Sequence, residues 1–513
     1  MNELMNYLSD KSAKFMSEKE REKYFKNNIN DYFEVYHSFF LRKRNKNKKL
    51  VSIVYDNALN IKGQLLRAAI AVRRTVLESG DSSLIQVYTK MNNLGKIIAS
   101  QSALPIAKRR KDLPQLEEQI NDLEKQLIKE SQEFAEISNR AKVNWKDIQK
   151  SLKKNETAIE FIHFRFFDYK GLTDSIFYYA LVLRKDYKYP KAIYLFEEKE
   201  LKKELKKTKI GSDGINNFYN NRGISPLFQE EEEINVSNID SLIWSPIEKE
   251  LNGVKKVYLS LSGLLNKISF ASIPYGDSLL LSDKYEIVHT SSTAMIIENT
   301  EFNFSEINKI ALFGGIKYSV TEEELKKANE KYKTSGNRMY FKDEKSRSSV
   351  WKYLPGTMEE VENISDFFNE ETKIKYETYS GASATEETFK SFEKNSPSIF
   401  HIATHGFYFP APEIDLNKRD NFMRLGDDKI SYNHSHNPLV RSGLLLAGGG
   451  TSWSGENVFK DVEDGVLSAY ETSNLNFFGI NLVVLSACQT GLGDVKGSEG
   501  VFGLQRAFKM GPE

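Results

Sequence analysis

The chain has 513 residues, with 72 basic and 71 acidic side chains and a formal net charge of +1. This balance gives no electrostatic reason to expect nucleic acid or an anionic membrane as the main partner. The single cysteine excludes an intramolecular disulfide and any CxxC zinc or redox site. Because no apolar signal region follows Met1 and no run of about 18 apolar residues occurs, we expect a soluble, cytoplasmic chain. Its length predicts about three units of roughly 150 residues, or two large ones.

Residues 1–153 show the periodicity of helices and are expected to form an all-α region. The stretch from Val51 to Ser79 repeats apolar residues every three or four positions and predicts one helix, which ends before Gly80. A helix over Leu84–Ser100 follows, and another that starts at Pro114 carries a heptad seam. This pattern predicts an antiparallel helical hairpin or a short coiled coil without a clean tetratricopeptide signature. The region is expected to be a scaffold or an interaction arm.

Residues 154–305 have the β-branched and aromatic composition of strands. The expected strands are Ala158–Phe166, Ser175–Arg184, Ala192–Phe196, Val254–Leu261 and Tyr285–Thr290. Residues 201–235 are charged and contain glycine, which indicates a helix followed by a solvated loop rather than a binding patch. We therefore predict a second, α/β region here.

From Lys309 onward, strands and helices alternate, which predicts a mainly parallel sheet flanked by helices over residues 306–513. The expected strands begin at Lys309, Lys375, Ser398 and Ile480. The last of them, Ile480–Ala487, is nearly all apolar and is expected to be buried on both faces. Thr357 and Glu360 are expected to form a capping box at the start of a helix. Further helices are expected over Asp464–Leu475 and Ser498–Met510.

Two reactive side chains lie at the ends of expected strands. His405 ends the strand that begins at Ser398 and precedes Gly406, and Cys488 ends the strand that begins at Ile480. In open α/β sheets, active groups gather beyond the carboxyl ends of strands. A thiolate at Cys488 can attack a carbonyl while His405 assists deprotonation and protonates the leaving amine. The N–H groups of Gly406 and Cys488 can hold the oxyanion. On the residues alone, a quiet buried thiol stays an equal alternative.

The other histidines favour other interpretations. His401 precedes His405 in the same strand and is expected to be packed inside the sheet layer. His434 and His436 form an HxH pair in a polar loop without a third nearby ligand, so no metal site is predicted. The remaining histidines lie in earlier elements of the chain: His37, His163 and His289.

An acidic cluster and a glycine loop flank the predicted nucleophile in the sequence. The cluster comprises Asp461, Glu463 and Asp464. Asp464 is most simply the N-cap of the helix that follows it, and a pocket for a basic substrate side chain is the alternative. The glycines after Cys488 have the spacing GxGxxxG rather than GxGxxG, and no GK[ST] follows them. Nucleotide binding is therefore not expected.

Three motifs in this half resemble the CHAT domain, a caspase-like cysteine peptidase domain related to separase and commonly attached to tetratricopeptide repeats. They are ATHGF around His405, DGVLSAYE from Asp464 and LSACQTGLGDVKGSEGVFGLQRAF around Cys488, in the family's order and approximate spacing. Upstream, YDNALNIKGQLL, LVLRKD, SLSGLLNKISFASIP and LPGT resemble the repeat-linked CHAT proteins of bacteria. Residues 156–300 are similar to the inactive pseudo-peptidase half of such proteins.

The resemblance implies a caspase-like cysteine endopeptidase with His405 as general base and acid, Cys488 as nucleophile and Gly406 in the oxyanion hole. It implies cleavage of a partner protein under control of an attached helical sensor, without a metal or organic cofactor. A regulatory protein is expected to bind the N-terminal helices, and no direct role with nucleic acid or membrane is expected. Because the family pattern continues with at least one more strand, the domain is expected to be incomplete at Glu513. The alternative is a non-catalytic scaffold for protein–protein interactions.

Overall fold

In the computed structural model the chain forms two compact units. One comprises Met1–Ala68, Gln132–Thr300 and Val495–Gly500, and the other comprises Ala69–Ser131, Glu301–Asp494 and Val501–Glu513. The structure describes residues 16–102, 109–135, 143–207, 237–276, 278–297, 307–332, 351–371, 374–393, 395–410, 437–454, 462–477, 479–488, 490–491, 493–495 and 500–510. None of the helices in these ranges has the length and apolar character that a membrane crossing needs. The expected regions 1–153, 154–305 and 306–513 stay a prediction.

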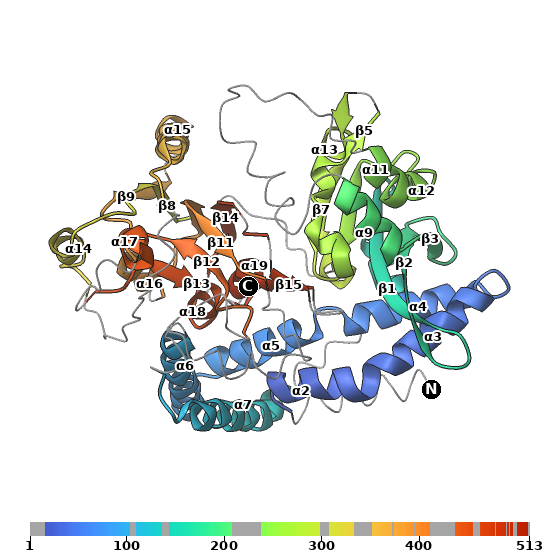
Figure 1. The fold of residues 1–513 in the computed structure, drawn as a ribbon, viewed down its shortest axis with the longest axis horizontal. Coiled ribbons are helices and arrows are strands. Elements are labelled where there is room, and N and C mark those ends of the chain that lie inside the picture. Colours follow the sequence, from blue (N-terminus) through green and yellow to red (C-terminus); the bar gives the residue numbers. More distant parts are fainter. Residues whose placement is uncertain are drawn as a thin grey trace. The chain divides into compact units, whose positions relative to one another are not determined.

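The first unit is built on a mixed sheet whose strands lie where the composition predicted them (Figure 1). The strands are β1 (Glu156–Phe167), β2 (Leu172–Arg184), β3 (Lys191–Glu197), β4 (Lys256–Ser260) and β7 (Glu286–Thr290). Their order is β3-β2-β1-β4-β7, in which β1, β4 and β7 are parallel while β2 is antiparallel to both β1 and β3. A separate antiparallel pair is formed by β5 (Pro274–Tyr275) and β6 (Leu279–Leu280).

Helices cover both faces of this sheet. They are α2 (Glu18–Tyr24), a π-helix (Phe25–Ile29), α3 (Asn30–Lys43), α4 (Lys49–Ile61), α8 (Trp145–Ser151), α9 (Glu198–Lys207), α11 (Ser237–Ile243), α12 (Ser245–Glu248) and α13 (Leu281–Lys284), with 3-10 turns over Gly263–Lys267, Phe270–Ser272 and Thr293–Ile296. Side chains alternate along β1, so that Ile159 and Phe161 pack with Trp244 while Ile162 and Phe164 pack with Tyr55. The sheet is therefore buried on both faces.

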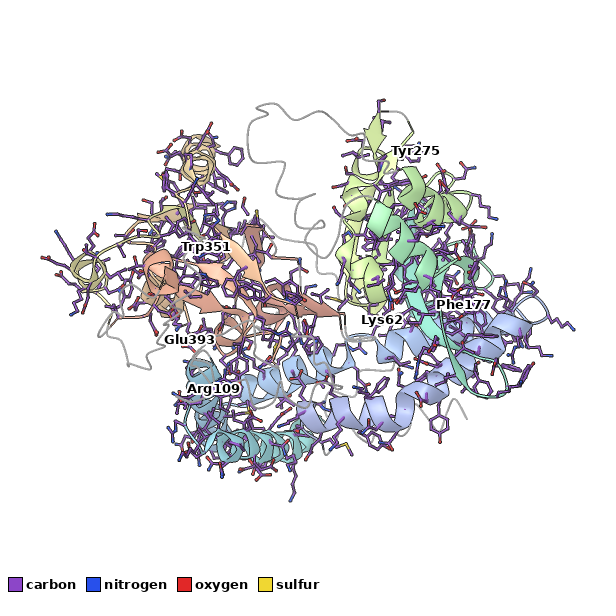
Figure 2. The ribbon with its side chains drawn as sticks, viewed as in Figure 1. Lys62, Arg109, Phe177, Tyr275, Trp351 and Glu393 are labelled. Carbon is purple, nitrogen blue, oxygen red and sulfur yellow. The ribbon has the colours of Figure 1, made fainter. Side chains whose placement is uncertain are left out.

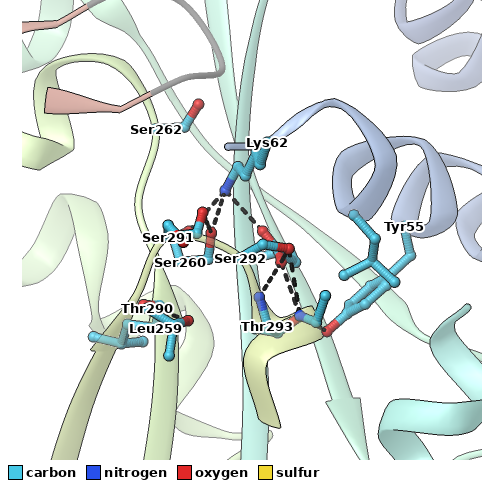
Figure 3. A network of polar contacts seen from close by, with 12 residues as sticks. Tyr55, Lys62, Leu259, Ser260, Ser262, Thr290, Ser291, Ser292 and Thr293 are labelled. Atoms are coloured by element: carbon cyan, nitrogen blue, oxygen red, sulfur yellow. Dashed lines mark hydrogen bonds and ion pairs between the residues drawn. The ribbon is translucent and has the colours of Figure 1, made fainter. Parts of the chain in front are cut away.

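The helix predicted over Val51–Ser79 is wrong as a single element, because the chain breaks at Lys62 and Gly63. α4 ends at Ile61 and α5 (Gln64–Glu78) begins after Gly63, whose φ of 63° is the left-handed conformation that glycine adopts readily. The Lys62 Nζ enters the sheet, where it donates to Glu160 Oε2 (2.8 Å) and to the backbone and hydroxyl oxygens of Ser260 (both 2.9 Å) (Figure 3). A buried ion pair, which periodicity does not encode, therefore ends the helix here.

The second unit contains the parallel sheet that the alternating pattern predicted. Within the described residues its order is β14-β10-β8-β9, and all three pairings are parallel. The strands are β8 (Lys309–Ile316), β9 (Lys375–Gly381), β10 (Ile399–Ala403) and β14 (Leu482–Ser486). An antiparallel sheet follows β10 and has the order β11 (Gly406–Tyr408), β12 (Ser442–Leu445) and β13 (Val466–Ser468). The predicted mixed α/β class with a largely parallel sheet is thus confirmed.

The helices of this unit include an N-terminal group and others that pack on the sheets. They are α6 (Ser82–Ser102), α7 (Leu113–Ala135), α14 (Glu322–Ala328), α15 (Pro355–Glu371), α16 (Glu386–Ser391), α17 (Gly449–Ser454), α18 (Ala469–Ser473) and α19 (Leu504–Lys509). Helices α5, α6 and α7 share a small apolar core of Val76, Leu84, Tyr88 and Leu127. The main core of this unit gathers aromatic rings from several elements, among them Phe313, Phe389, Phe400 and Phe477.

Two predicted helix caps are wrong for local reasons. α15 begins at Pro355, which suits the first helical position, so Thr357 lies inside the first turn. The Thr357 hydroxyl instead donates to Leu354 O (2.7 Å) and accepts from the Gly315 N–H (2.9 Å). Likewise, Asp464 does not cap a helix. Residues after Asp464 form β13, and the cap of α18 is Ser468 in a capping box with Glu471.

Two expectations for the C-terminal elements are also corrected. The helix expected over Ser498–Met510 starts only at Leu504, because Val501–Gly503 form β16, which pairs with β15 (Gly493–Val495). The strand β14 is not buried on both faces, since Leu482 is 43 % exposed. In the part of the chain that the structure describes, β14 is an edge strand of its sheet, and this accounts for the exposure of its apolar side chains.

Candidate active site

His405 and Cys488, the predicted general base and nucleophile, follow neighbouring parallel strands. In the ladder between β10 and β14, Ala403 is opposite Ser486. The N–H of Thr404 extends this ladder by donating to Ser486 O (3.2 Å). His405 comes directly after this contact on one strand, and Cys488 comes just beyond it on the other. Because parallel strands end at the same edge of a sheet, the two residues lie at one sheet edge.

Gly406 packs closely against the backbone of Cys488. A Cβ atom at Gly406 would lie 2.3 Å from the carbonyl oxygen of Cys488 and 3.2 Å from Cγ2 of Thr490, and real Cβ contacts essentially never fall below 3.0 Å. Only glycine therefore permits this approach. The structure brings the His405–Gly406 segment and Cys488 together, and their catalytic roles stay a prediction.

The imidazole of His405 is oriented by a main-chain carbonyl. Its Nε2 lies 2.8 Å from the carbonyl oxygen of Lys352. A carbonyl oxygen can only accept a hydrogen bond, so Nε2 carries the proton in this contact. In the neutral ring Nδ1 then holds a lone pair. The arrangement thus leaves Nδ1 as the atom of His405 that can take a proton.

Aromatic rings enclose the same imidazole. The ring centroid of His405 is 4.8 Å from that of Tyr318 and 4.9 Å from that of Trp351, which is marked in Figure 2. Tyr318 is itself held by a hydrogen bond between its hydroxyl and Thr404 Oγ1 (2.9 Å). Burial lowers the pKa of His405 below its ordinary value of 6.5, and the bond to Lys352 opposes this shift. The ring is therefore kept neutral at neutral pH, as a general base requires.

Sequence reasoning did not identify Trp351 and Lys352 as neighbours of His405. Trp351 also contacts Trp453 edge-to-face, with ring centroids 5.5 Å apart. Lys352 contacts His405 through its backbone oxygen, so the identity of its side chain does not reveal this contact in the sequence. The only sequence feature nearby is LPGT, which follows Lys352 almost directly and which the family resemblance includes.

The thiol of Cys488 is exposed. Within the described residues, it makes no hydrogen bond with the His405 ring, although both side chains are described. Catalytic hydrogen bonds are often long or poorly aligned without substrate and tighten when the reacting complex forms.

The N–H of Gly406 points away from β12. The carbonyl of His405 accepts a hydrogen bond from the Leu445 N–H (2.9 Å) on β12. The described chain contains no cis peptide bond. In a trans peptide the C=O of one residue and the N–H of the next point in opposite directions. The Gly406 N–H is thus directed to the side opposite β12, and its role as an oxyanion donor stays a prediction. The matching role of the Cys488 N–H stays a prediction.

Of the acidic residues expected as substrate-pocket candidates, Glu463 pairs with a half-buried lysine. Glu463 Oε1 lies 3.1 Å from Lys390 Nζ, which also contacts Glu386 (2.6 Å) and Glu471 (3.1 Å). Asp464 is buried, its Oδ1 accepts from the Val466 N–H (2.8 Å), and burial raises its pKa well above the ordinary value. Asp461 lies outside the described residues. A pocket for a basic substrate side chain stays a prediction.

His401 is buried inside the sheet layer, as predicted. Its Nε2 lies 3.0 Å from Glu360 Oε1 without the alignment of a hydrogen bond, and Glu360 Oε2 accepts from the Ser486 hydroxyl (2.9 Å). The HxH pair at His434 and His436 lies outside the described residues. Among those that are described, no group of three or more histidine, cysteine or carboxylate side chains is arranged to hold a metal ion.

Comparison with protein-family models decides the family. The model of the CHAT domain matches residues 234–510, which is more than half of the chain and includes His405, Gly406 and Cys488. The chain belongs to the CHAT-domain family. This family is caspase-like and related to peptidases. No curated protein matches the chain. The matched range begins in the first unit, so it includes residues 234–300 of that unit as well as the parallel sheet of the second.

Proposed function

We propose that this CHAT-domain protein is a cysteine endopeptidase in which Cys488 and His405 form a catalytic dyad. The observation that carries the proposal is the contact of Gly406 with the Cys488 carbonyl, which brings a thiol and an imidazole to one sheet edge. The bond from His405 Nε2 to Lys352 O supports it, because it leaves Nδ1 as the proton acceptor.

The proposed reaction proceeds through an acyl-enzyme. His405 Nδ1 takes the proton of the Cys488 thiol, and the sulfur forms a bond to the carbonyl carbon of the scissile peptide. The oxyanion is held by the N–H groups of Gly406 and Cys488. The imidazolium then gives its proton to the amine as the C–N bond breaks. Water, deprotonated by His405, hydrolyses the thioester and restores the thiol. These steps use no metal or organic cofactor.

We further propose that the substrate is a partner protein and that the helical region controls cleavage. A regulatory protein that binds these helices is the expected trigger, and no nucleic acid or membrane is needed. A reducing compartment such as the cytoplasm suits the proposal, because it keeps the nucleophile as a free thiol.

One observation favours a second candidate, a non-catalytic scaffold. The Cys488 thiol and the His405 ring make no hydrogen bond with each other in the described part of the chain. A scaffold predicts that Cys488 reacts no faster in the folded chain than in the unfolded chain, and that partner binding survives its replacement. A peptidase instead predicts that Cys488 reacts faster in the folded chain than in the unfolded chain.

The test compares new protein N-termini in cells that produce the wild-type chain, Cys488→Ala, His405→Ala or the control His289→Ala, which changes an exposed histidine of β7. We expect cleavage products with the wild type and the control, and none with the two dyad variants at unchanged melting temperature. A thiol-reactive peptide probe that labels folded Cys488 no faster than the unfolded chain would contradict the proposal.

A further inference from the structure

The chain segment that follows Cys488 contacts β11, the strand that carries Gly406, at a second place, Asp494. Asp494 lies further along this segment, in β15, and Tyr408 lies at the other end of β11 from Gly406. The Tyr408 hydroxyl donates to Asp494 Oδ1 at 3.0 Å. β11 thus meets the segment twice, through Gly406 at Cys488 and through Tyr408 at Asp494.

A buried arginine completes this attachment. Arg441 precedes β12 and is 1 % exposed. Its Nη2 forms an ion pair with Asp494 Oδ2, and its Nη1 donates to Phe409 O at 2.6 Å. A charge-assisted pair of this kind is short and directional, and a buried guanidinium is costly when its carboxylate is removed. Asp494 is therefore held on both carboxylate oxygens by side chains of the antiparallel sheet.

The described residues between Cys488 and Asp494 contact their own turn, β16 and the Gly406 end of β11. The Thr490 hydroxyl donates to Ala487 O (3.1 Å), within the same turn. Gly493 packs against β16, where a Cβ atom would lie 2.4 Å from Phe502 O. The described segment thus meets β11 near Gly406, through Cys488 and Thr490, and near Tyr408, through Asp494. Fixing both ends limits the directions in which the Cys488 backbone can move relative to Gly406.

We propose that Asp494 is a positioning residue for Cys488, acting through Tyr408 and Arg441 to hold the nucleophile's segment against the strand that follows His405. The inference rests on the proposed function, because it assigns Asp494 a role in the reaction of that dyad. Asp494, Tyr408 and Arg441 act on the position of Cys488 and do not touch the reacting atoms. Its effect is on the distance between the Cys488 sulfur and the His405 ring, to which reaction rates are sensitive.

Thiol alkylation offers a direct readout, because Cys488 is the only cysteine of the chain. When neutral His405 takes the proton of the thiol, the resulting imidazolium stabilises the thiolate, which is the species that reacts. We compare alkylation by iodoacetamide from pH 5.5 to pH 9 in the full-length chain for the wild type, Asp494→Asn and Tyr408→Phe. Asparagine keeps the volume of Asp494 but removes its charge, and phenylalanine removes only the hydroxyl.

We expect Asp494→Asn to slow alkylation about tenfold near pH 6.5 and Tyr408→Phe about threefold, with both approaching the wild-type rate near pH 9. Alkylation is measured well below the melting temperature of each variant, so that a loss of stability alone leaves the folded state populated and the alkylation rate unchanged. The matched control is Asp112→Asn, which breaks the exposed pair that Asp112 makes with Arg110 (2.7 Å) and should keep the wild-type profile.

The outcomes separate this inference from the proposed function. If His405→Ala leaves the pH profile of alkylation unchanged, the dyad itself is contradicted. If His405→Ala changes the profile while Asp494→Asn and Tyr408→Phe do not, only the positioning role is overturned. Should Asp494→Asn fail to fold in a thermal melt, Tyr408→Phe decides alone, since it leaves the ion pair with Arg441 intact.

Discussion

At the scale of single residues, Gly406 is a position of the candidate site that has no room for a side chain. The backbone of Gly406 is in an ordinary strand, so its requirement for glycine does not come from conformational strain. It comes from the neighbouring Cys488 carbonyl, which occupies the space of a Cβ atom. A methyl group here has to push two strand ends apart, and these are the ends that carry the thiol and the imidazole.

We therefore expect Gly406→Ala to lower the cleavage rate by about a hundredfold, because a displacement near 1 Å is sufficient for such a loss. The measurement is the rate of cleavage of an identified substrate, together with the melting temperature. Gly356→Ala is the matched control, since Gly356 lies in the first turn of α15 with nothing within 4 Å of an added Cβ. Equal rates for the two variants would show that the close approach has no catalytic consequence.

The residues of the site differ in how far the sequence could reveal them. His405 and Cys488 were predictable because each combines a reactive side chain with a position at a strand end. Lys352 and Trp351 were not, since one contributes a backbone oxygen and the other is separated from His405 by a long stretch of chain. Asp494 is visible in the motif after Cys488, but its partners Tyr408 and Arg441 are identified only by the packing of β11 against β12.

At the scale of elements, the junction of α4 and α5 depends on one buried ion pair. Lys62 and Glu160 are 3 % and 0 % exposed at their side chains and lie 2.8 Å apart. Glu160 also accepts hydrogen bonds from the N–H and hydroxyl of Thr293 (2.6 and 2.8 Å). Burial lowers the pKa of Lys62, and the charge of Glu160 opposes that shift. The pair thus joins a helix end to β1 and to the turn after β7.

We expect Lys62→Met to destabilise the first unit by about 3–5 kcal/mol, because it leaves a buried carboxylate without its cation. The double variant Lys62→Met with Glu160→Gln should recover part of this loss. Denaturant unfolding of the three chains measures the difference. Lys150→Met serves as control, since Lys150 pairs with Asp147 (3.4 Å) in an exposed position; a loss as large as that of Lys62→Met would refute the burial argument.

The secondary-structure elements show which parts of the fold can be predicted from local sequence patterns. Strand composition located β1, β2, β3, β4 and β7, because β-branched and aromatic residues recur along each of them. The break at Gly63, the cap at Ser468 and the late start of α19 were missed, since each is decided by a partner distant in sequence or by a competing local motif. In residues 466–468, for example, pairing with β12 overrides the helical pattern that continues into α18.

At the scale of the whole molecule, the N-terminal helices divide between the two units, and Arg73 anchors α5 in the second. Arg73 is buried and donates to Met510 O (3.1 Å), to Ser473 O (3.4 Å) and to Leu475 O. These carbonyls lie just beyond or at the C-terminal ends of α18 and α19, where a cation is favourable. The helix α5 is thus tied to the element that follows the nucleophile's segment.

Arg73→Ala is expected to lower the free energy of unfolding of the second unit by about 1–3 kcal/mol, because the carbonyls lose a buried charged donor. Hydrogen exchange should increase selectively in α18 and α19. The adjacent Arg74→Ala is the control, as Arg74 is exposed on the same helix. Uniform exchange changes over the whole chain, or none in α18 and α19, would contradict an anchoring role.

The carbonyl of Lys352 has a consequence for experiments that survey the protein by mutation. An alanine scan removes side chains but leaves every peptide oxygen in place, so Lys352→Ala keeps the group that orients His405. Such a scan would score this position as neutral. Only a chemical change of the main chain, such as an amide-to-ester replacement, or a shift of the whole backbone stretch, can remove the contact. A regulator that moves this stretch would therefore act where side-chain genetics detects nothing.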